Sequence, residues 1–489
     1  MKSTWPVTLL AALALVTVHT LFHLTFMQQY LDWDQIVYLN NIRNALQPER
    51  LPLLNPHHLH LEIGGAHWHS FILERWGDAG LTDLAFNNRL RSLAAAAVAL
   101  FFFVLFLREM TGSTLWALAG AILLAGTHGY MAYATKVDTP VFPSATLAMT
   151  LWVVQRLEQT RRVPLVWGVL GGVILFLGVM AHQYMAIPAV LGCVALVLPR
   201  WLFPDPRRWA PFRRSSPQRD RSVRDIPRRA VATVVMALVG VSLVAGAYFW
   251  AGKTVYNLPF AGEQGVEARG PLRSNTFQRW LFLYAGTNMW GRGLEQFDPR
   301  APFRGYTDMF ISQPGTVTRF NRNYRFEDGF VHRQLRNMTA FLVAATVILL
   351  PALWMRYRRL FVFVLSTAVV KILFTTYWEA YYYEFWIIPG MLLVVLLVMI
   401  LHHLAVLLNG VTLRGGSLPG VAYLLFLSLV FFNHNVQHYL VNYSRVQRLE
   451  SYSSEWPESY YLPLFSTDIY LHPQDVHREA FPGSLRSVQ

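Results

Sequence analysis

The chain has 489 residues, of which 54% are hydrophobic and only 14% are charged, and its mean hydropathy is +0.31. Soluble proteins average about 25% charged residues, so this composition excludes an ordinary soluble enzyme and indicates a polytopic membrane protein. The net charge of +14 would also suit a nucleic-acid-binding protein. However, the basic residues are concentrated between apolar runs, where membrane topology accounts for them, and no nucleic-acid partner is expected.

Apolar runs long enough to cross a membrane, about 20 residues each, recur along the chain. The predicted spans are Pro6–Met27, Ala85–Leu107, Leu115–Ala134, Thr139–Val154, Val163–Met180, Gln183–Leu202, Ala230–Ala251, Thr339–Trp354, Leu360–Thr376, Phe385–Leu408 and Pro419–Phe432. The first run follows Lys2 and lacks a clear small-residue cleavage site, which favours an uncleaved helix over a signal peptide. We therefore predict an all-α polytopic membrane protein with about 11 transmembrane helices in residues 1–432.

Lys and Arg residues in the short loops set the predicted orientation. With eleven spans they all fall on one side, at positions 2, 108, 156, 161, 162, 356, 358, 359 and 414. The linker 199–229, with ten Arg against three Asp, falls on the same side and is predicted to be cytoplasmic. The N-terminus is then inside and the C-terminus outside. Three large segments lie on the external face, namely residues 30–84, 252–338 and the C-terminal cap 433–489.

The first external segment begins with two carboxylates around a tryptophan, Asp32-Trp33-Asp34. On a helix these carboxylates would point about 200° apart, so they should not share one role. Asp34 and Tyr38 are four residues apart and could share a face of a helix that Asp32 caps. A catalytic carboxylate is one interpretation, and helix capping beside an interfacial tryptophan is the other.

A run of histidines follows in the same segment, at positions 57, 58, 60, 67 and 69. Their spacing on an extended chain would suit a divalent cation, Mg²⁺ or Mn²⁺, with Asp32, Asp34, His58 and His60 as candidate ligands. Neither HExxH nor a Cys/His zinc pattern is present. The sequence favours the alternative in which His57 and His58, after Pro56, form a hydrogen-bonded corner that shapes a substrate pocket with Tyr38.

Three cationic or titratable residues stand out later in the chain. Lys371 lies inside an apolar run, where a charge is costly unless it meets an anion or snorkels to the interface. Lys136 occupies a predicted external turn and could bind a phosphate or pair with Asp138. His182, at another external turn, could contact a phosphate or satisfy the backbone of the turn.

Aromatic residues and carboxylates alternate in the segment TYWEAYYYEFW at 376–386. Trp378, Glu379, Tyr382 and Glu384 are candidate sugar-binding residues, because aromatic faces stack on sugars and carboxylates accept hydrogen bonds from their hydroxyls. The alternative is an aromatic belt at the membrane interface.

These features together resemble the GT-C superfamily of polyprenyl-phosphate-dependent glycosyltransferases. That superfamily includes protein O-mannosyltransferases and the aminoarabinose transferase of lipid A. The resemblance lies in the uncleaved first helix, the late external loop and the acidic motif Asp32–Tyr38; Tyr130–Pro140 and Thr376–Pro389 fit it more loosely. The Arg-Asp-Glu style motif of the aminoarabinose transferase is absent.

The resemblance implies an inverting membrane glycosyltransferase in the bacterial inner (plasma) membrane, with its active site facing the periplasm or exterior. Asp34, or else Asp32, would be the catalytic base. The donor would be a polyprenyl-phosphate sugar in contact with membrane lipid, and Lys371, Lys136 and His182 are candidates to bind its phosphate. The acceptor, a protein, lipid or glycan, is left open.

Other functions remain compatible with many membrane spans. A lipid or polysaccharide flippase or transporter is the main alternative, although the chain shows no internal repeat of the kind that transporters carry. A non-catalytic assembly subunit and an oligosaccharide ligase are two further possibilities.

Overall fold

The computed structural model describes residues 5–27, 33–47, 54–159, 164–198, 202, 225–269, 276–282, 300–311, 329–379, 383–411 and 418–436. Within these residues all regular structure is helical. The helices are α1 (Trp5–Thr25), α2 (Trp33–Ala45), α3 (Leu59–Trp76), α4 (Leu84–Thr111), α5 (Thr114–Ala125), α6 (His128–Tyr133), α7 (Val141–Gln159), α8 (Pro164–Ala181), α9 (Ala186–Val197), α10 (Asp225–Phe249), α11 (Phe277–Leu281), α14 (Ala301–Phe310), α15 (Gly329–Glu379), α16 (Ile387–Val411) and α17 (Leu418–Asn435). Short 3₁₀ turns η1 (Gly77–Ala79), η2 (Gln183–Met185) and η9 (Tyr383–Trp386) and the π-turn η7 (Trp250–Val255) connect some of them.

Most of the predicted linker 199–229, much of the external segment 252–338 and the cap beyond residue 436 lie outside the described residues. Six helices are long and apolar enough to cross a membrane, namely those at 5–25, 84–111, 229–255, 329–377, 384–408 and 418–435. Three shorter apolar helices accompany them. The all-α architecture is thus confirmed for the described residues, and these helices are consistent with a polytopic membrane protein, whereas the number of eleven spans and their orientation stay predictions.

One predicted span differs from the structure. The predicted single span Leu115–Ala134 is wrong, because α5 ends at Ala125 and α6 begins only at His128. The break is held by side chains: the Thr127 hydroxyl donates to the Leu124 carbonyl at 2.7 Å, and Asn435 donates to the Gly126 carbonyl at 2.8 Å. A backbone interruption inside an apolar layer needs such partners, because lipid offers none.

The two spans predicted on either side of the Arg356–Arg359 loop form two helices that meet at a kink. The range of α15 covers both, and the backbone leaves helical geometry at Arg358, where φ is 48° and ψ is −121°. An arginine in this left-handed region is strained. The two predicted spans are therefore separated at Arg358, inside the predicted loop.

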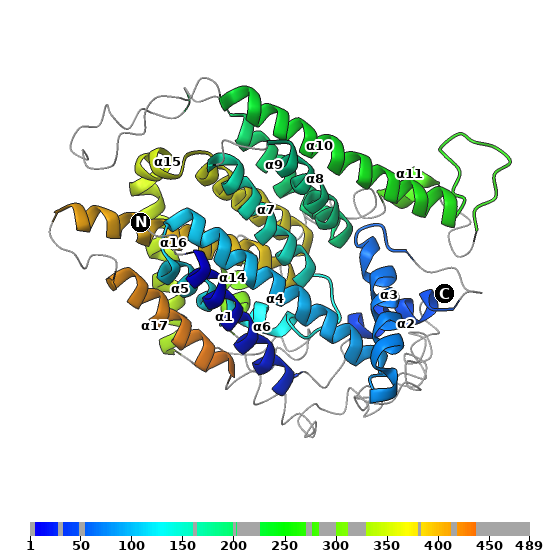
Figure 1. The fold of residues 1–489 in the computed structure, drawn as a ribbon, viewed down its shortest axis with the longest axis horizontal. Coiled ribbons are helices and arrows are strands. Elements are labelled where there is room, and N and C mark those ends of the chain that lie inside the picture. The colour runs from blue at the N-terminus through cyan, green and yellow to red at the C-terminus, as the bar shows by residue number, and fades with distance from the viewer. Residues whose placement is uncertain are drawn as a thin grey trace.

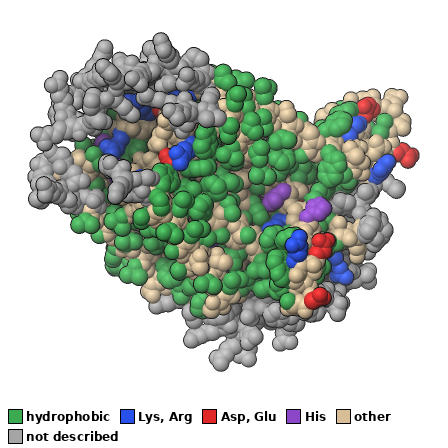
Figure 2. Space-filling model, viewed as in Figure 1, with side chains coloured by type: hydrophobic (Ala, Val, Ile, Leu, Met, Phe, Trp, Pro, Cys, Tyr) green, Lys and Arg blue, Asp and Glu red, His purple; other side chains and the backbone are tan. Residues whose placement is uncertain are grey.

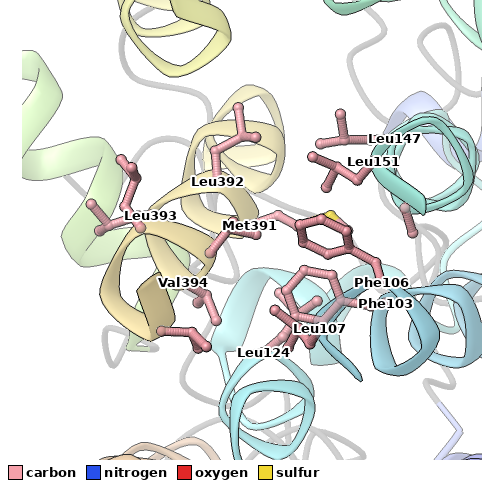
Figure 3. Close-up of a cluster of buried hydrophobic side chains, with 14 of the residues drawn as sticks. Phe103, Phe106, Leu107, Leu124, Leu147, Leu151, Met391, Leu392, Leu393 and Val394 are labelled. Atoms are coloured by element: carbon pink, nitrogen blue, oxygen red, sulfur yellow. The ribbon is translucent and has the colours of Figure 1, made fainter. Parts of the chain in front are cut away.

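The core lies between α4, α5, α7 and α16. Figure 3 shows Phe103 and Phe106 from α4 directed toward Met391 of α16, with Leu124 and Leu151 closing the sides. By contrast, large apolar side chains on the outer helices are exposed, such as Leu10 (68%) and Ile348 (75%). Figure 2 shows apolar side chains covering the middle of one face and charged ones toward the ends. Such a surface suits lipid and is unusual in soluble proteins.

Helices α8 and α10 form a close pair along one edge of the bundle (Figure 1). Glycines in α8 permit this: a Cβ atom at Gly168 would lie 2.7 Å from the Ala232 carbonyl, and one at Gly172 would lie 2.8 Å from the Met236 carbonyl. Small residues at such contacts let helix backbones approach within the membrane. The residues that follow these helices, His182 after α8 and Tyr256 after η7, both contact residues 54–57.

Basic residues of the predicted cytoplasmic loops lie together at one end of the bundle. Arg156 pairs with Glu109 at 2.7 Å, and Arg359 and Arg229 approach Glu158 at 3.3 and 3.5 Å. The helices that carry these residues run to the opposite end before reaching the first external segment and His182. The structure therefore separates the two predicted sides of the protein, and which side faces the cytoplasm stays a prediction.

Cysteine labelling in a Cys193→Ser background should establish that orientation. Gln159 and Gln264 are both exposed and lie on the predicted inner and outer sides. We expect an impermeant thiol reagent applied from outside to label Gln264→Cys in intact cells, and to label Gln159→Cys only after permeabilisation. The reverse pattern would contradict the assignment of the candidate site to the external face.

Candidate functional site

The candidate site begins where residues 54–57, in the segment predicted to be external, are tied to the ends of α8 and α10. The Gln183 amide donates to the His57 carbonyl at 2.8 Å, and the Tyr248 hydroxyl donates to the Pro56 carbonyl at 2.6 Å. The Leu54 amide donates to the hydroxyl of Tyr256. Three contacts between segments more than 100 residues apart thus fix the predicted corner before His57 and His58.

An array of rings extends from this corner. The His57 ring lies 4.0 Å from that of His58 and 5.4 Å from that of His182, and Tyr38 meets the His58 ring edge-on at 5.1 Å. His182 in turn stacks on Tyr184 at 3.9 Å. Four of the predicted site residues, from three separate parts of the chain, therefore lie in one cluster.

His57, at the centre of this array, has a lowered pKa. Burial holds the pKa of His57 well below its usual range, and the neighbouring His58 and His182 lower it further. A neutral imidazole has one donor and one acceptor nitrogen. His57 therefore suits hydrogen bonding to a polar ligand better than it suits carrying charge.

Lys371 joins the array from α15. Its side chain is 0% exposed, and its Nζ lies 3.4 Å from the centre of the Tyr184 ring and 4.6 Å from that of Phe374. Among the described residues Nζ has no hydrogen-bond partner. The ammonium is therefore not at the surface, as snorkelling would require. Aromatic faces compensate a buried cation only in part, so an anion would find a strong partner here.

Lys136 and Glu384 are connected through Tyr133. The Lys136 Nζ lies 4.7 Å above the Tyr133 ring, whose hydroxyl donates to Glu384 Oε2 at 2.7 Å. Asp138 accepts a hydrogen bond from the Thr139 amide at 2.6 Å and so holds the turn before α7. The cation and the carboxylate that the sequence singled out separately are thus linked by a tyrosine.

The acidic motif is only partly described. Asp34 and Tyr38 share helix α2, as expected, while Asp32 and the side chain of Asp34 lie outside the described residues. The neighbouring Gln35 side chain accepts a hydrogen bond from the Val137 amide at 3.2 Å. Gln35 follows Asp34 in α2, and Val137 follows Lys136 in the turn. This hydrogen bond therefore holds the backbone of Asp34 near the turn that carries Lys136. Tyr382 and the side chains of Trp378 and Glu379 also lie outside the described residues.

The expectation of an extended histidine segment is wrong. His60, His67 and His69 lie on helix α3, where His60 packs against Phe142 at 4.5 Å and His69 contacts Asn87 at 3.0 Å. No group of three His, Cys, Asp or Glu side chains is placed to hold a metal ion within the part of the chain that the structure describes. A cation bound with Asp32 and Asp34 stays a prediction.

Three residues of the cluster were not anticipated as site residues from the sequence. Tyr184 and Tyr133 contact the two lysines, and Glu62 lies beside His58. Tyr133 falls in a segment that resembles the superfamily, and Glu62 follows His58 by four residues, which is helical spacing. Neither signal distinguishes these residues from others in an aromatic-rich chain.

No protein-family model matches the chain, and no curated protein sequence matches it. Two solved structures are similar at 14% identity and a TM-score of 0.48. One is the archaeal oligosaccharyltransferase AglB from Archaeoglobus fulgidus in complex with an inhibitory peptide and a dolichol-phosphate, matched over 94% of this chain and 60% of that one. The other is ArnT from Cupriavidus metallidurans bound to undecaprenyl phosphate, matched over 97% of this chain and 86% of that one. The chain spans 60% of the length of AglB.

Proposed function

We propose that this chain is a membrane glycosyltransferase that moves a sugar from a polyprenyl-phosphate donor to an acceptor at the external face. The observation that carries the proposal is the buried Lys371 ammonium, which lies among the rings at the end of an apolar helix bundle and has no hydrogen-bond partner in the described residues. A lipid phosphate combines an anionic group with a tail that belongs in the membrane. It therefore matches both parts of this environment.

The donor phosphate would lie against Lys371, His182 and Lys136. An ammonium–phosphate contact is a charge-assisted hydrogen bond, and such bonds are about twice as strong as neutral ones. Positive charge is needed most as the bond to the sugar breaks, because the leaving phosphate gains negative charge. His57 would donate or accept a further hydrogen bond without adding charge to the site.

The sugar would lie toward Tyr133 and Glu384, whose hydrogen-bonded pair offers an aromatic face and a carboxylate. Transfer needs the acceptor hydroxyl oxygen to attack the anomeric carbon as the carbon–oxygen bond to phosphate breaks. The bonding electrons leave with the polyprenyl phosphate, and the acceptor's proton passes to the Asp34 carboxylate as general base. Attack opposite the leaving group inverts the anomeric configuration.

The described histidines give little support for a divalent cation. His58 faces Glu62 and His60 packs on Phe142, so these two candidate ligands do not converge with a third described group. The transfer step proposed above therefore uses no Mg²⁺ or Mn²⁺, and substitution of Asp32 and Asp34 tests whether these carboxylates bind a cation.

Binding of polyprenyl phosphate to the purified protein tests the proposal without knowledge of the acceptor. At a concentration 100 times the Kd, a ligand that binds only the folded protein stabilises it by about 2.7 kcal/mol. We expect polyprenyl phosphate to raise Tm in detergent and polyprenol of the same length to have little effect. An equal effect of the two lipids would contradict recognition of the phosphate.

The sugar-charged donor then separates an enzyme from a transporter. Incubation of the protein with polyprenyl-phosphate sugar and an envelope extract should release free polyprenyl phosphate. Binding without release would favour movement of the lipid across the membrane over transfer of its sugar.

A further inference from the structure

Glu62 is a fully buried carboxylate beside the ring array. It is 0% exposed in the first turn of α3, and its Oε1 lies 3.5 Å from Nδ1 of His58, one helical turn earlier. Neither carboxylate oxygen of Glu62 and neither ring nitrogen of His58 has a hydrogen-bond partner within the described residues, so the 3.5 Å contact is at ion-pair distance. Burying an unpaired carboxylate costs several kcal/mol. The position of Glu62 therefore calls for a cationic partner.

Two basic side chains, His58 and Arg91, are close enough to be considered. His58 is within ion-pair distance of Glu62. Arg91 is also buried, but its Nη1 donates to the Leu61 carbonyl at 3.0 Å and its guanidinium packs on Phe142 at 4.7 Å. No ion pair within 4.0 Å joins Arg91 to Glu62 in the residues described. The geometry thus favours His58, and Arg91 provides the competing, purely structural explanation.

The His58 ring links Glu62 to the ring array. Since Nδ1 faces Glu62, the geometry of the ring directs Nε2 away from that carboxylate. His58 itself lies between the rings of His57 at 4.0 Å and Tyr38 at 5.1 Å. A carboxylate that holds one nitrogen of a histidine fixes the tautomer and the orientation of the other.

We propose that Glu62 is a positioning residue that holds His58 so that its Nε2–H is offered to the phosphate of the lipid donor. This inference rests on the proposed function. With Nδ1 facing Glu62 at 3.5 Å and Nε2–H offered to the donor, His58 would lie between two anions, Glu62 and the phosphate. Glu62 would then contribute to donor binding without contacting the donor.

Two double-mutant cycles distinguish this role from charge balance with Arg91. The variants are Glu62→Gln, His58→Gln and Arg91→Gln, with Glu74→Gln on the exposed side of α3 as the matched control. Each variant is measured for its affinity for polyprenyl phosphate and for Tm without ligand. Residues that act as a unit give a double mutant no worse than either single one.

We expect Glu62→Gln and His58→Gln each to weaken affinity by about tenfold or more, the loss typical of a hydrogen bond to a charged group. The Glu62/His58 double variant should lose no more than that, and the Glu62/Arg91 losses should be additive. If Glu62→Gln does not fold, Glu62→Asp, which keeps the charge but withdraws it by one methylene, should give an intermediate affinity.

Normal affinity in Glu62→Gln, with a lowered Tm that Arg91→Gln restores, would overturn the inference and assign Glu62 to Arg91. If the wild-type protein binds no polyprenyl phosphate, the proposed function fails, and with it the role of His58 toward phosphate. In that case the Tm cycles still show separately whether Glu62 is coupled to His58 or to Arg91.

Discussion

Replacing Lys371 with methionine should weaken binding of polyprenyl phosphate by about tenfold or more and leave the protein folded. The loss follows from the removal of a hydrogen bond between charged groups, which is worth about 1.5–3 kcal/mol. Methionine keeps most of the volume of the lysine stem between Tyr184 and Phe374. It also removes a buried charge whose desolvation is unfavourable. The Tm without ligand should therefore stay unchanged or rise, whereas a structural ion pair would make it fall.

Lys253→Met provides the matched control for that experiment. Lys253 also lies at the predicted external end, but its Nζ already pairs with Glu263 at 3.1 Å and lies over the Phe260 ring at 4.0 Å. Titration of both variants with polyprenyl phosphate, and with polyprenol as the uncharged lipid, measures the phosphate contribution directly. Equal affinity of Lys371→Met and wild type would place the phosphate elsewhere.

The helices could be predicted from the sequence because a lipid-exposed backbone has to satisfy its own hydrogen bonds. The residues at which the helices end could not be predicted in this way. The break after Ala125 depends on Asn435, which lies over 300 residues away and whose amide bonds the Gly126 carbonyl. Likewise, Gly64 and Gly65 disfavour a helix by about 1 kcal/mol each. A Cβ atom at Gly65 would lie 2.6 Å from Ile42, so the close approach of α2 to α3 explains a glycine inside α3.

Some residues of the candidate site could likewise be predicted from the sequence, and others could not. Lys371 could be singled out because a charge in an apolar run is rare and costly, and the structure brings it within reach of His182 through Tyr184. Tyr184 and Glu62 carry no such signal. A tyrosine in an aromatic-rich chain and a glutamate in a helix of mixed composition are ordinary, and their significance lies only in which side chains the fold places beside them.

The largest loss of rate is expected from Asp34→Asn. Asparagine keeps the shape of aspartate and its capacity to hydrogen-bond, but it cannot accept a proton at working pH. Loss of a general base typically reduces the rate by about 10²–10⁴-fold. The backbone of Asp34 is held by its neighbour Gln35 against Val137, beside Lys136. We therefore expect turnover of the sugar-charged donor to fall by that factor, while affinity for polyprenyl phosphate and Tm stay near the wild-type values.

Asp32→Asn and Asp78→Asn complete the experiment. Asp78 lies exposed in η1, away from the ring array, and its variant should behave as wild type. Asp32→Asn should cost less than Asp34→Asn if Asp32 only supports the helix start. If the two carboxylates jointly hold a cation, both variants should lose turnover, and wild-type turnover should depend on added Mg²⁺ or Mn²⁺.

Full turnover in Asp34→Asn would contradict the assignment of Asp34 as the base. Because binding and transfer are measured separately, that result would leave the phosphate site around Lys371 intact. It would favour Glu384 as the base, the carboxylate that accepts a hydrogen bond from the Tyr133 hydroxyl at 2.7 Å.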